Sequence, residues 1–416
     1  MLAIVPIHCP DPGLLMTTLR RCVRCHLPET YETIEFDAEG ICNICRSAEH
    51  KTSVDWAERK DLLDKLVAKY RGKSDYDCIV PFSGGKDSTF QLYYLVKEYK
   101  LKPLVVRFNH GFMRPVIARN NERTLKQLGV DVLEFTPNWH IVKRVMLESF
   151  RRKTDFCWHC HSGIYSYPLR IATKFNVPLV FWGEPHSEIA AYYDYLNDTI
   201  EYEDEKKFNM FRNLGISADD MHGMISTPEN PVDRRDLLPY TYPALQELKK
   251  INYCSICLGS FIPWDYVKNT EIIKRELGWE ADELEGVPTA LNTSGEKIEC
   301  FMQGSRDYIK FLKRGYTRVS QISAFHLRNG RLTDEEAERY RQIEGRRPPS
   351  LDHFLGYVGL SEDEFNEIVR GTQVPPYEHD YSNVVDASKT WDFEQWYRED
   401  NRDPELVSIQ RRRRGS

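Results

Sequence analysis

The stretch DCIVPFSGGKDSTFQLYYLV, residues 77–96, limits most strongly what this 416-residue chain can fold into. Residues 78–82 form a short apolar run, which is typical of a buried strand. Apolar residues then recur at helical spacing from Phe90 onward, so the polar hexapeptide Ser83–Ser88 lies at a strand-to-helix turn. Its two glycines allow close approach of a ligand, and the helix directs unpaired N–H groups and its positive dipole end at the turn. With the charge of Lys86, this arrangement predicts a phosphate-binding loop.

The hexapeptide does not fit the two best-known nucleotide loops. A Walker A loop has four residues between its first glycine and its Gly-Lys pair, and the nearest earlier glycine here is Gly72. The three spaced glycines of dinucleotide-binding folds are missing too. The hexapeptide instead resembles the PP-loop of the ATP pyrophosphatase superfamily, whose members split ATP into AMP and pyrophosphate and activate an oxygen as an adenylate. The alternative is an ordinary polar turn before a helix.

Strand and helix patterns alternate after this loop. Strands are expected at 103–111, 130–136 and 177–184, and helices at 114–128, 139–152 and 163–175. Such alternation predicts an α/β fold with a parallel, Rossmann-like sheet covered by helices on both faces. Ligands of these sheets bind at the carboxyl ends of strands. Two further segments therefore join the loop as candidate nucleotide-binding elements, namely Asn109-His110-Gly111 and Gly183-Glu184.

The eleven cysteines are many for a reduced chain unless some of them bind metal. Cys22 and Cys25 form one CxxC pair, Cys42 and Cys45 form another, and 16 residues separate the pairs. This spacing is that of a four-thiolate zinc ribbon, in which the metal replaces a core that so small a segment cannot build. A closed site of this kind is structural. Two disulfides or a rubredoxin-like iron site are the alternatives.

Two later CxxC pairs are about a hundred residues apart, and the sequence does not show whether they meet. They are Cys157 with Cys160 and Cys254 with Cys257. If they meet, they hold a second zinc ion or an iron–sulfur cluster. Otherwise, one pair lines the active site and the other is buried as small apolar residues.

Composition favours a cytoplasmic enzyme. The chain is 41% hydrophobic and carries 57 basic and 63 acidic residues, a net charge of −6, which argues against a dedicated nucleic-acid binder. No apolar run is long enough to span a membrane, and residues 1–15 lack the basic segment of a signal peptide. Either Met1 or Met16 is a candidate start.

The pattern changes after the alternating region. Residues 192–250 are acidic and then proline-rich, as in an insertion or lid. Residues 299–345 are helical and basic, and Arg306, Lys310 and Arg314 can share a face that is either solvated or in contact with a phosphate-bearing substrate. We therefore expect an extension at 1–17, a zinc ribbon at 18–50, an ATP-binding domain at 51–290 with its insertion, a helical region at 291–370 and a flexible polar tail at 371–416.

Several motifs in the chain together resemble one family. They include DAEGICNIC, PFSGGKDST, CWHCHSGIYSYPLR, FWGEPHSE, FIPWD, ELGWEADELEGVP and EKIECFMQGSRDYIKFLKRGYTR, within about residues 18–370. The chain is similar to the bacterial N-acetyl sugar amidotransferases of O-antigen and nonulosonic acid pathways. Such enzymes convert an acetamido group on a sugar to an acetamidino group, so the resemblance implies lipopolysaccharide biosynthesis and a free or nucleotide-linked acetamido sugar as substrate.

The resemblance also implies roles for individual residues. Backbone N–H groups of Ser83, Gly84 and Gly85, with Lys86 and Ser88, are expected to hold the phosphates of ATP. Asp87 is expected to place Mg²⁺, which prefers carboxylate and phosphate oxygens. Glu184 is a candidate for positioning ammonia or Mg²⁺, and Asn109, His110 and Gly183 are expected near the nucleotide. The candidates for sugar binding are Trp264, Asp265, Arg306, Lys310 and Arg314.

Ammonia needs a source, and no strand-to-helix elbow with a nucleophilic cysteine is visible in the sequence. The resemblance implies a separate glutaminase subunit like that of histidine biosynthesis, with or without a cyclase-like barrel subunit. Two other classes remain open. A tRNA thiolation enzyme would share the loop and the ribbon but use a cysteine-bound cluster or persulfide, and a non-catalytic protein would use zinc and nucleotide only for interactions.

Overall fold

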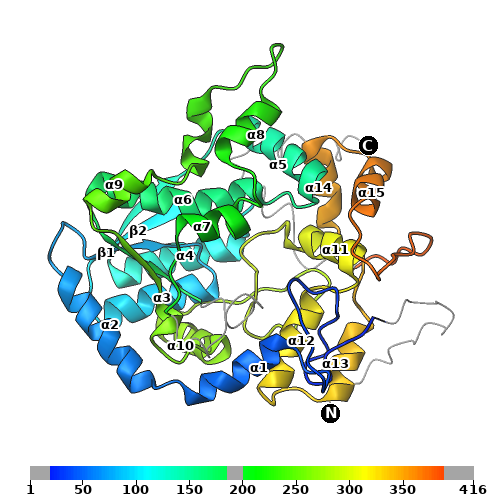
Figure 1. Cartoon of the computed structure of the whole chain (residues 1–416), viewed down its shortest axis with the longest axis horizontal. Coiled ribbons are helices and arrows are strands. Elements are labelled where there is room, and N and C mark those ends of the chain that lie inside the picture. The colour runs from blue at the N-terminus through cyan, green and yellow to red at the C-terminus, as the bar shows by residue number, and fades with distance from the viewer. Residues whose placement is uncertain (1–18, 185–199, 388–416) are drawn as a thin grey trace.

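The computed structural model describes residues 19–184 and 200–387, which form a five-stranded parallel sheet with helices on both faces and a helical region beside it (Figure 1). The strands are β1 (Cys78–Pro81), β2 (Pro103–Phe108), β3 (Asp131–Phe135), β4 (Leu179–Trp182) and β5 (Cys254–Cys257), in the spatial order β3-β2-β1-β4-β5. Four of them lie where the sequence predicts strands. The α/β class with a parallel sheet is therefore confirmed.

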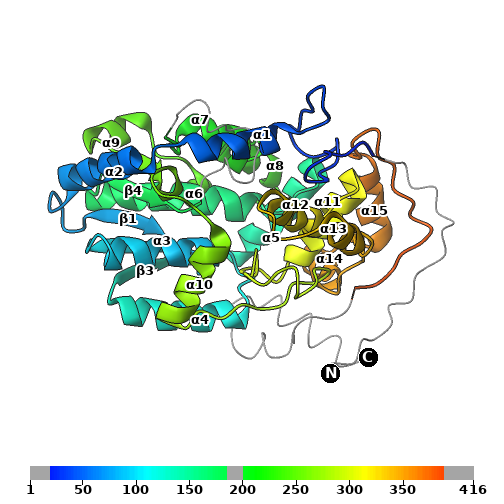
Figure 2. The same ribbon diagram turned by 90° about the horizontal axis from the view of Figure 1, so that it is seen from below.

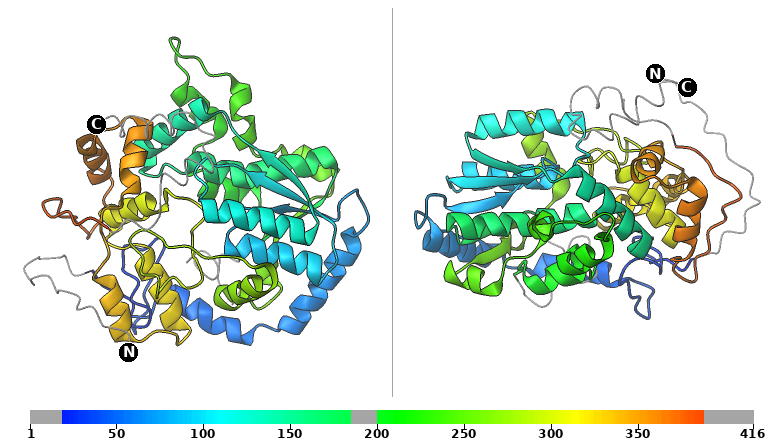
Figure 3. Two further views of the ribbon diagram at one scale, coloured as in Figure 1. Left: turned by 180° about the vertical axis from the view of Figure 1, so that it is seen from behind. Right: turned by 90° about the horizontal axis from the view of Figure 1, so that it is seen from above.

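Alternating side chains of each strand enter two separate cores. Val80 of β1 packs with α2 (Trp56–Tyr70), α3 (Lys86–Lys97), α4 (Pro115–Leu128) and α10 (Tyr266–Leu277). Ile79 faces the other way and packs with α6 (Trp158–Phe175), next to which lies α5 (Trp139–Lys153). Figures 2 and 3 show the sheet between these two layers of helices. Burial on both faces explains why the strands read as continuous apolar runs.

The fifth strand is missing from the sequence-based prediction. β5 pairs in parallel with β4, with Leu179 opposite Cys254 and Trp182 opposite Cys257. Its four residues, CSIC, are too few and too mixed in polarity to show a period of two. The later CxxC motif is thus part of the sheet rather than a metal-binding turn.

The described part of the expected insertion consists of short helices that cover α5 and α6. They are α7 (Glu205–Lys207), η4 (Phe208–Arg212), α8 (Ala218–Ile225), η5 (Arg234–Tyr240) and α9 (Leu245–Lys250). Met221 and Tyr240 are buried against Trp158 and Phe108. This segment and the sheet domain therefore share a hydrophobic core. The remainder of the expected insertion lies outside the described residues.

A second helical body follows the sheet domain. It contains α11 (Gln303–Arg314), α12 (Arg318–Arg328), α13 (Asp334–Arg341), α14 (Ser350–Val358) and α15 (Glu362–Arg370). Phe354 and Phe365 lie at its centre and pack on Phe150 of α5, which joins the two bodies. The short helices α1 (Asn43–His50), η1 (Lys51–Ser53) and η6 (Leu258–Ser260) complete the described elements.

The first part of the expected polar tail, residues 371–387, has defined contacts with the helical body. Val374 donates from its backbone N–H to the carbonyl of Lys313, and Tyr377 is buried against Phe311 of α11. Arg347 likewise donates from its backbone N–H to the carbonyl of Val385. These contacts show that residues 371–387 belong to the helical body, because an aromatic anchor outweighs the polar composition around it. In the described ranges, no helix is long and apolar enough to cross a membrane.

Ile256 provides a test of β5 as a core strand. Its side chain is 1% exposed, so Ile256→Ala should destabilise the protein by about 2–5 kcal/mol through lost burial and a residual cavity. Leu245→Ala on the exposed side of α9 is the control and should change stability by no more than about 0.5 kcal/mol. Urea unfolding followed by tryptophan fluorescence measures both, and equal effects would contradict the assignment of β5.

Candidate active site

Four cysteines converge in the N-terminal segment, residues 19–50, which is called the cysteine module below. The sulfur atoms of Cys22, Cys25, Cys42 and Cys45 all lie within 4.8 Å of one another and are buried. The distance is 3.9 Å between the sulfurs of Cys22 and Cys45 and 3.6 Å between those of Cys25 and Cys42. Four Zn–S bonds of about 2.3 Å in a tetrahedron separate the sulfurs by about 3.8 Å. The four thiols therefore fit a single Zn²⁺ ion.

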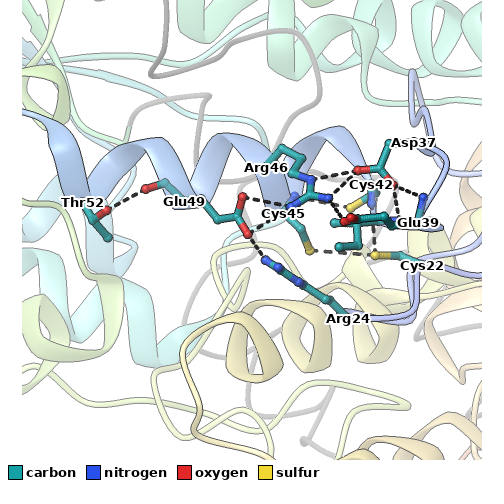
Figure 4. Close-up of polar contacts among 10 residues, drawn as sticks. Cys22, Arg24, Asp37, Glu39, Cys42, Cys45, Arg46, Glu49 and Thr52 are labelled. Carbon is teal, nitrogen blue, oxygen red and sulfur yellow. Dashed lines mark hydrogen bonds and ion pairs between the residues drawn. The ribbon is translucent and has the colours of Figure 1, made fainter.

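Charged residues hold the turns of the cysteine module around this group (Figure 4). The guanidinium of Arg46 on α1 pairs with Asp37 at 2.7 Å and also with Glu39 and Glu49. Asp37 in turn accepts hydrogen bonds from the backbone of the turn that precedes Cys42. Because these pairs lie near the surface, they orient the turns more than they stabilise the fold.

The cysteine module lies directly against the C-terminal helices. Arg314 at the end of α11 donates to the carbonyl of Thr30 at 2.5 Å, and Thr30 Oγ1 donates back to the carbonyl of Arg314 at 2.5 Å. Glu32 accepts a hydrogen bond from the hydroxyl of Tyr316. Figures 1 and 2 show the module beside α12. Segments nearly 300 residues apart in the sequence thus form one unit.

The predicted phosphate loop has the expected strand–turn–helix geometry. Gly85 caps α3, which begins at Lys86, and the Ser88 hydroxyl accepts hydrogen bonds from the backbone N–H of Ser83 at 3.3 Å and of Gly84 at 3.1 Å. Gly84 has φ +87°, and an added Cβ would lie 1.7 Å from the amide of Asn121. A side chain at Gly84 would therefore clash with Asn121, and close approach of a ligand to these glycines stays a prediction.

A chain of alternating charges surrounds the start of α3. The Lys86 ammonium is buried and contacts the carboxylates of Asp87 and, at 2.5 Å, Glu296. Lys297 contacts Glu184 at 3.4 Å and Glu296 at 4.0 Å. Glu184, predicted from its position after β4, therefore meets Lys86 and Asp87 in one cluster.

Burial alone lowers the pKa of Lys86, but the carboxylates of Asp87, Glu296 and Glu184 together raise it well above its usual value. The ammonium therefore stays charged. Burial also raises the pKa of Asp87, and the neighbouring Glu184 and Glu296 raise it further while Lys86 opposes them. Three acidic groups, Asp87, Glu184 and Glu296, thus share this cluster with Lys86 and Lys297.

A cavity of about 130 Å³ opens beside this cluster. Its walls come from the loop, the cysteine module, the start of α10 and α12. The lining residues are Leu27, Tyr31, Ile44, Lys86, Asp87, Glu184, Trp264, Tyr266, Glu296, Arg318, Gln321, Ile322, Phe325 and Arg328. The first residue of α10, Tyr266, places its ring 4.7 Å from the Lys86 ammonium. The cavity is the feature that brings the loop and the C-terminal helices into one site.

Several residues that line the cavity have a fully buried polar atom without a hydrogen-bond partner among the described residues. These atoms are Oδ1 of Asp87, Nε1 of Trp264, Nε of Arg318, Oε1 of Gln321 and Nη1 of Arg328. A buried polar atom without a partner costs free energy, so such atoms commonly mark a ligand or ordered water. Both donors and acceptors are present in the set.

Other predicted site residues have defined structural contacts. Asn109 Oδ1 accepts from the Gly111 N–H at 3.0 Å, and His110 Nδ1 accepts from the Phe112 N–H at 3.2 Å, so both side chains shape the turn after β2. Burial lowers the pKa of His110 to about 3, which keeps the ring neutral. An added Cβ at Gly183 would lie 3.3 Å from the Asp87 carbonyl oxygen. Contact of these residues with a nucleotide stays a prediction.

The candidates for sugar binding separate into two groups. Trp264 lines the cavity, whereas Asp265 caps α10 and pairs with Arg331. On α11, Arg306 pairs with Asp155 at 3.0 Å, Lys310 lies over the ring of Tyr316 at 5.5 Å, and Arg314 holds the cysteine module. These three cations are thus engaged within the protein and do not form the solvated face described as one alternative. Whether they also contact a substrate stays a prediction.

The two later CxxC pairs do not form a shared metal site. Within residues 19–184 and 200–387, the first four cysteines are the one group of histidine, cysteine or acidic residues close enough to ligate a metal. Cys254 and Cys257 lie on β5, and Cys157 and Cys160 lie at the start of α6. Of the two alternatives, the one in which both pairs hold a common second metal is therefore wrong, because the sheet holds one pair in an extended strand. Burial raises the pKa of the Cys257 thiol, so this side chain stays uncharged and packs as a small apolar residue.

Several site residues are absent from the sequence-based list. Glu296 and Lys297 lie in the EKIEC motif noted above, and Gln321 and Arg328 lie on α12. Trp279 donates from Nε1 to the carbonyl of Gly84 at 3.0 Å and so supports the loop from 195 residues away. The adjacent charges Glu296 and Lys297 in EKIEC could have indicated a polar site, but no local pattern indicates that they meet Lys86.

Comparison with known proteins links this site to a biological context. A family model described as "LPS biosynthesis protein WbpG-like, C-terminal domain" matches residues 296–396, a range that starts at Glu296 and includes α11 to α15. Over 214 residues, 49% of this chain and 76% of the relative, the chain is 22% identical to an uncharacterized protein of Methanocaldococcus jannaschii. The family match indicates an enzyme of surface polysaccharide biosynthesis.

The cysteine module generates a metal-content prediction. A Cys22→Ser/Cys42→Ser variant should lose one equivalent of zinc, because two of four ligands are removed. The control Cys254→Ser should keep it, since that thiol lies on β5. Elemental analysis of the purified proteins measures both. Unchanged zinc in the double variant would sink the assignment.

Proposed function

We propose that this protein is an ATP-dependent amidotransferase that converts an acetamido group of a sugar to an acetamidino group. The observation that carries the proposal is the cavity, which joins the start of α3 to helices of the segment that matches a lipopolysaccharide biosynthesis family. The loop Ser83–Ser88 supplies a helix N-terminus and the buried cation Lys86, both suited to a phosphate group. The sugar is free or linked to a nucleotide.

The chemistry follows from the low reactivity of amides. Resonance protects the amide carbonyl, so its oxygen must first become a leaving group. In the proposed reaction the amide oxygen attacks the α-phosphorus of ATP, and pyrophosphate leaves. Ammonia then attacks the imidate carbon, and AMP departs with the former amide oxygen. The product carries C=NH in place of C=O.

Residues of the charge cluster have matching roles. Lys86 and the N–H groups at the start of α3 stabilise negative charge as pyrophosphate leaves. Asp87 has a carboxylate oxygen without a partner among the described residues, and Glu184 lies in the same cavity, so these two side chains fit Mg²⁺. When bound, the ion would offset charge on the phosphates.

Ammonia is proposed to come from a separate glutaminase subunit. Cys78, a thiol close to the loop in sequence, lies inside β1, and burial raises its pKa, which does not suit a nucleophile. The acidic groups Glu184 and Glu296 offer positions for ammonium in the cavity. A glutaminase partner, with or without a barrel subunit, remains part of the proposal.

The runner-up is a tRNA thiolation enzyme with the same loop. Sulfur transfer of that kind needs an open cluster or a persulfide at the site. In the part of the chain that the structure describes, the cysteines within ligand distance form a closed set of four. That arrangement and the net charge of −6 support the amidotransferase.

The reaction products test the proposal directly. Incubation with ATP, ammonium and a UDP-diacetamido sugar should form AMP and pyrophosphate in equal amounts, only when the sugar is present. Mass spectrometry should show a sugar lighter by the difference between O and NH. ADP and phosphate as products, or an unchanged sugar, would refute the proposed reaction.

Lys86 can be tested separately. Lys86→Ala removes a buried charge at the leaving pyrophosphate and should lower kcat by roughly a hundredfold, or about 3 kcal/mol. Lys97→Ala, at the exposed end of the same helix, is the matched control and should keep full activity. Circular dichroism and zinc content check that both variants are folded. Full activity of Lys86→Ala would remove the loop from the mechanism.

A further inference from the structure

We infer that the cavity is the pocket for the acyl group of the substrate, and that the cysteine module selects the size of that group. The inference rests on the proposed function and assigns a role in specificity to Leu27 and Ile44. A closed thiolate site is ordinarily structural. Here its neighbours reach the same cavity as Lys86 and Asp87.

The position of Ile44 links the thiolates to the cavity. In the sequence, Ile44 stands between Cys42 and Cys45, two of the four thiolate residues, and it belongs to the first turn of α1. Leu27 follows Cys25 by two residues, and both apolar side chains are buried. A metal held by these thiolates therefore fixes the backbone that carries this wall. Ile322 and Phe325 of α12 add further apolar surface.

The volume of the cavity limits its occupant. An engineered cavity of about 150 Å³ accepts benzene, a planar group of six heavy atoms. At about 130 Å³, this cavity suits a group such as acetamido, with four heavy atoms, and is too small for a nucleotide or a whole sugar. The rest of the substrate must therefore lie outside it.

Polar side chains among the residues that line the cavity are candidate partners for an amide. Trp264 is 2% exposed and Arg318 is 8% exposed. Nε1 of Trp264 and Nε of Arg318 are hydrogen-bond donors without a partner among the described residues. Oε1 of Gln321 is an acceptor that also has no partner among the described residues. An amide presents one carbonyl acceptor and one N–H donor, so it can satisfy groups of both kinds. The methyl group of the acyl chain can then pack against the apolar wall formed by Leu27 and Ile44.

This assignment predicts a change in acyl preference. Wild-type protein should prefer an N-acetyl over an N-propionyl sugar by about 10- to 200-fold in kcat/KM, the range for one methylene in an apolar pocket. Ile44→Ala removes part of the apolar wall and so enlarges the cavity. It should reduce the preference for N-acetyl over N-propionyl at least tenfold. Ile41→Ala is the matched control, since Ile41 is buried in the cysteine module but does not line the cavity; it should leave the preference unchanged.

AMP formation with ammonium measures each rate, and zinc content verifies the cysteine module. Ile322→Ala, on α12, is a second variant that does not depend on the metal and should shift the preference in the same direction. An unchanged preference in both Ile44→Ala and Ile322→Ala, with wild-type protein active, would overturn the acyl-pocket assignment alone. A wild-type protein that forms no AMP with either sugar would instead overturn the proposed function, and this inference with it.

Discussion

The buried ammonium of Lys86 is the interaction on which the rest of the site depends. It is 3% exposed, and a charge removed from water is tolerated only with close partners. One carboxylate partner, Asp87, is its neighbour in the loop, whereas Glu296 comes from the start of the segment that matches the family model, and the ring of Tyr266 at the start of α10 lies 4.7 Å away. The ion pair with Glu296 and the cation–π contact with Tyr266 connect the loop of the sheet domain to the C-terminal region and to α10.

The cysteine module is the second constraint. A segment of about thirty residues buries too little apolar surface to fold alone, so metal ligation would supply the missing stability. The module is also attached to the helical body through Thr30, Arg314 and the pair Glu32–Tyr316. The cavity lies between these parts, so its shape depends on the metal site as well as on the loop.

Local patterns were sufficient for much of the fold. The strand–turn–helix at Ser83–Ser88, four of five strands and the Cys22–Cys45 spacing are all visible in short windows, because each depends on period, turn chemistry or ligand spacing. The fifth strand was missed because CSIC is too short for its period to be seen. A second metal site remained an alternative because Cys254 and Cys257 have the CxxC spacing of metal ligands.

The sequence by itself determined the α/β class, the loop with its buried lysine, and four thiols with the spacing of one metal ion. Tertiary structure alone decided which distant residues complete the site. That Glu296, Trp264 and Arg318 line one cavity with Lys86 is not visible in their own segments, because it arises from packing across long sequence separations. It also decided that Arg314 holds the cysteine module and that Ile44 faces the cavity, since a side chain's neighbours depend on how helices pack rather than on its own segment.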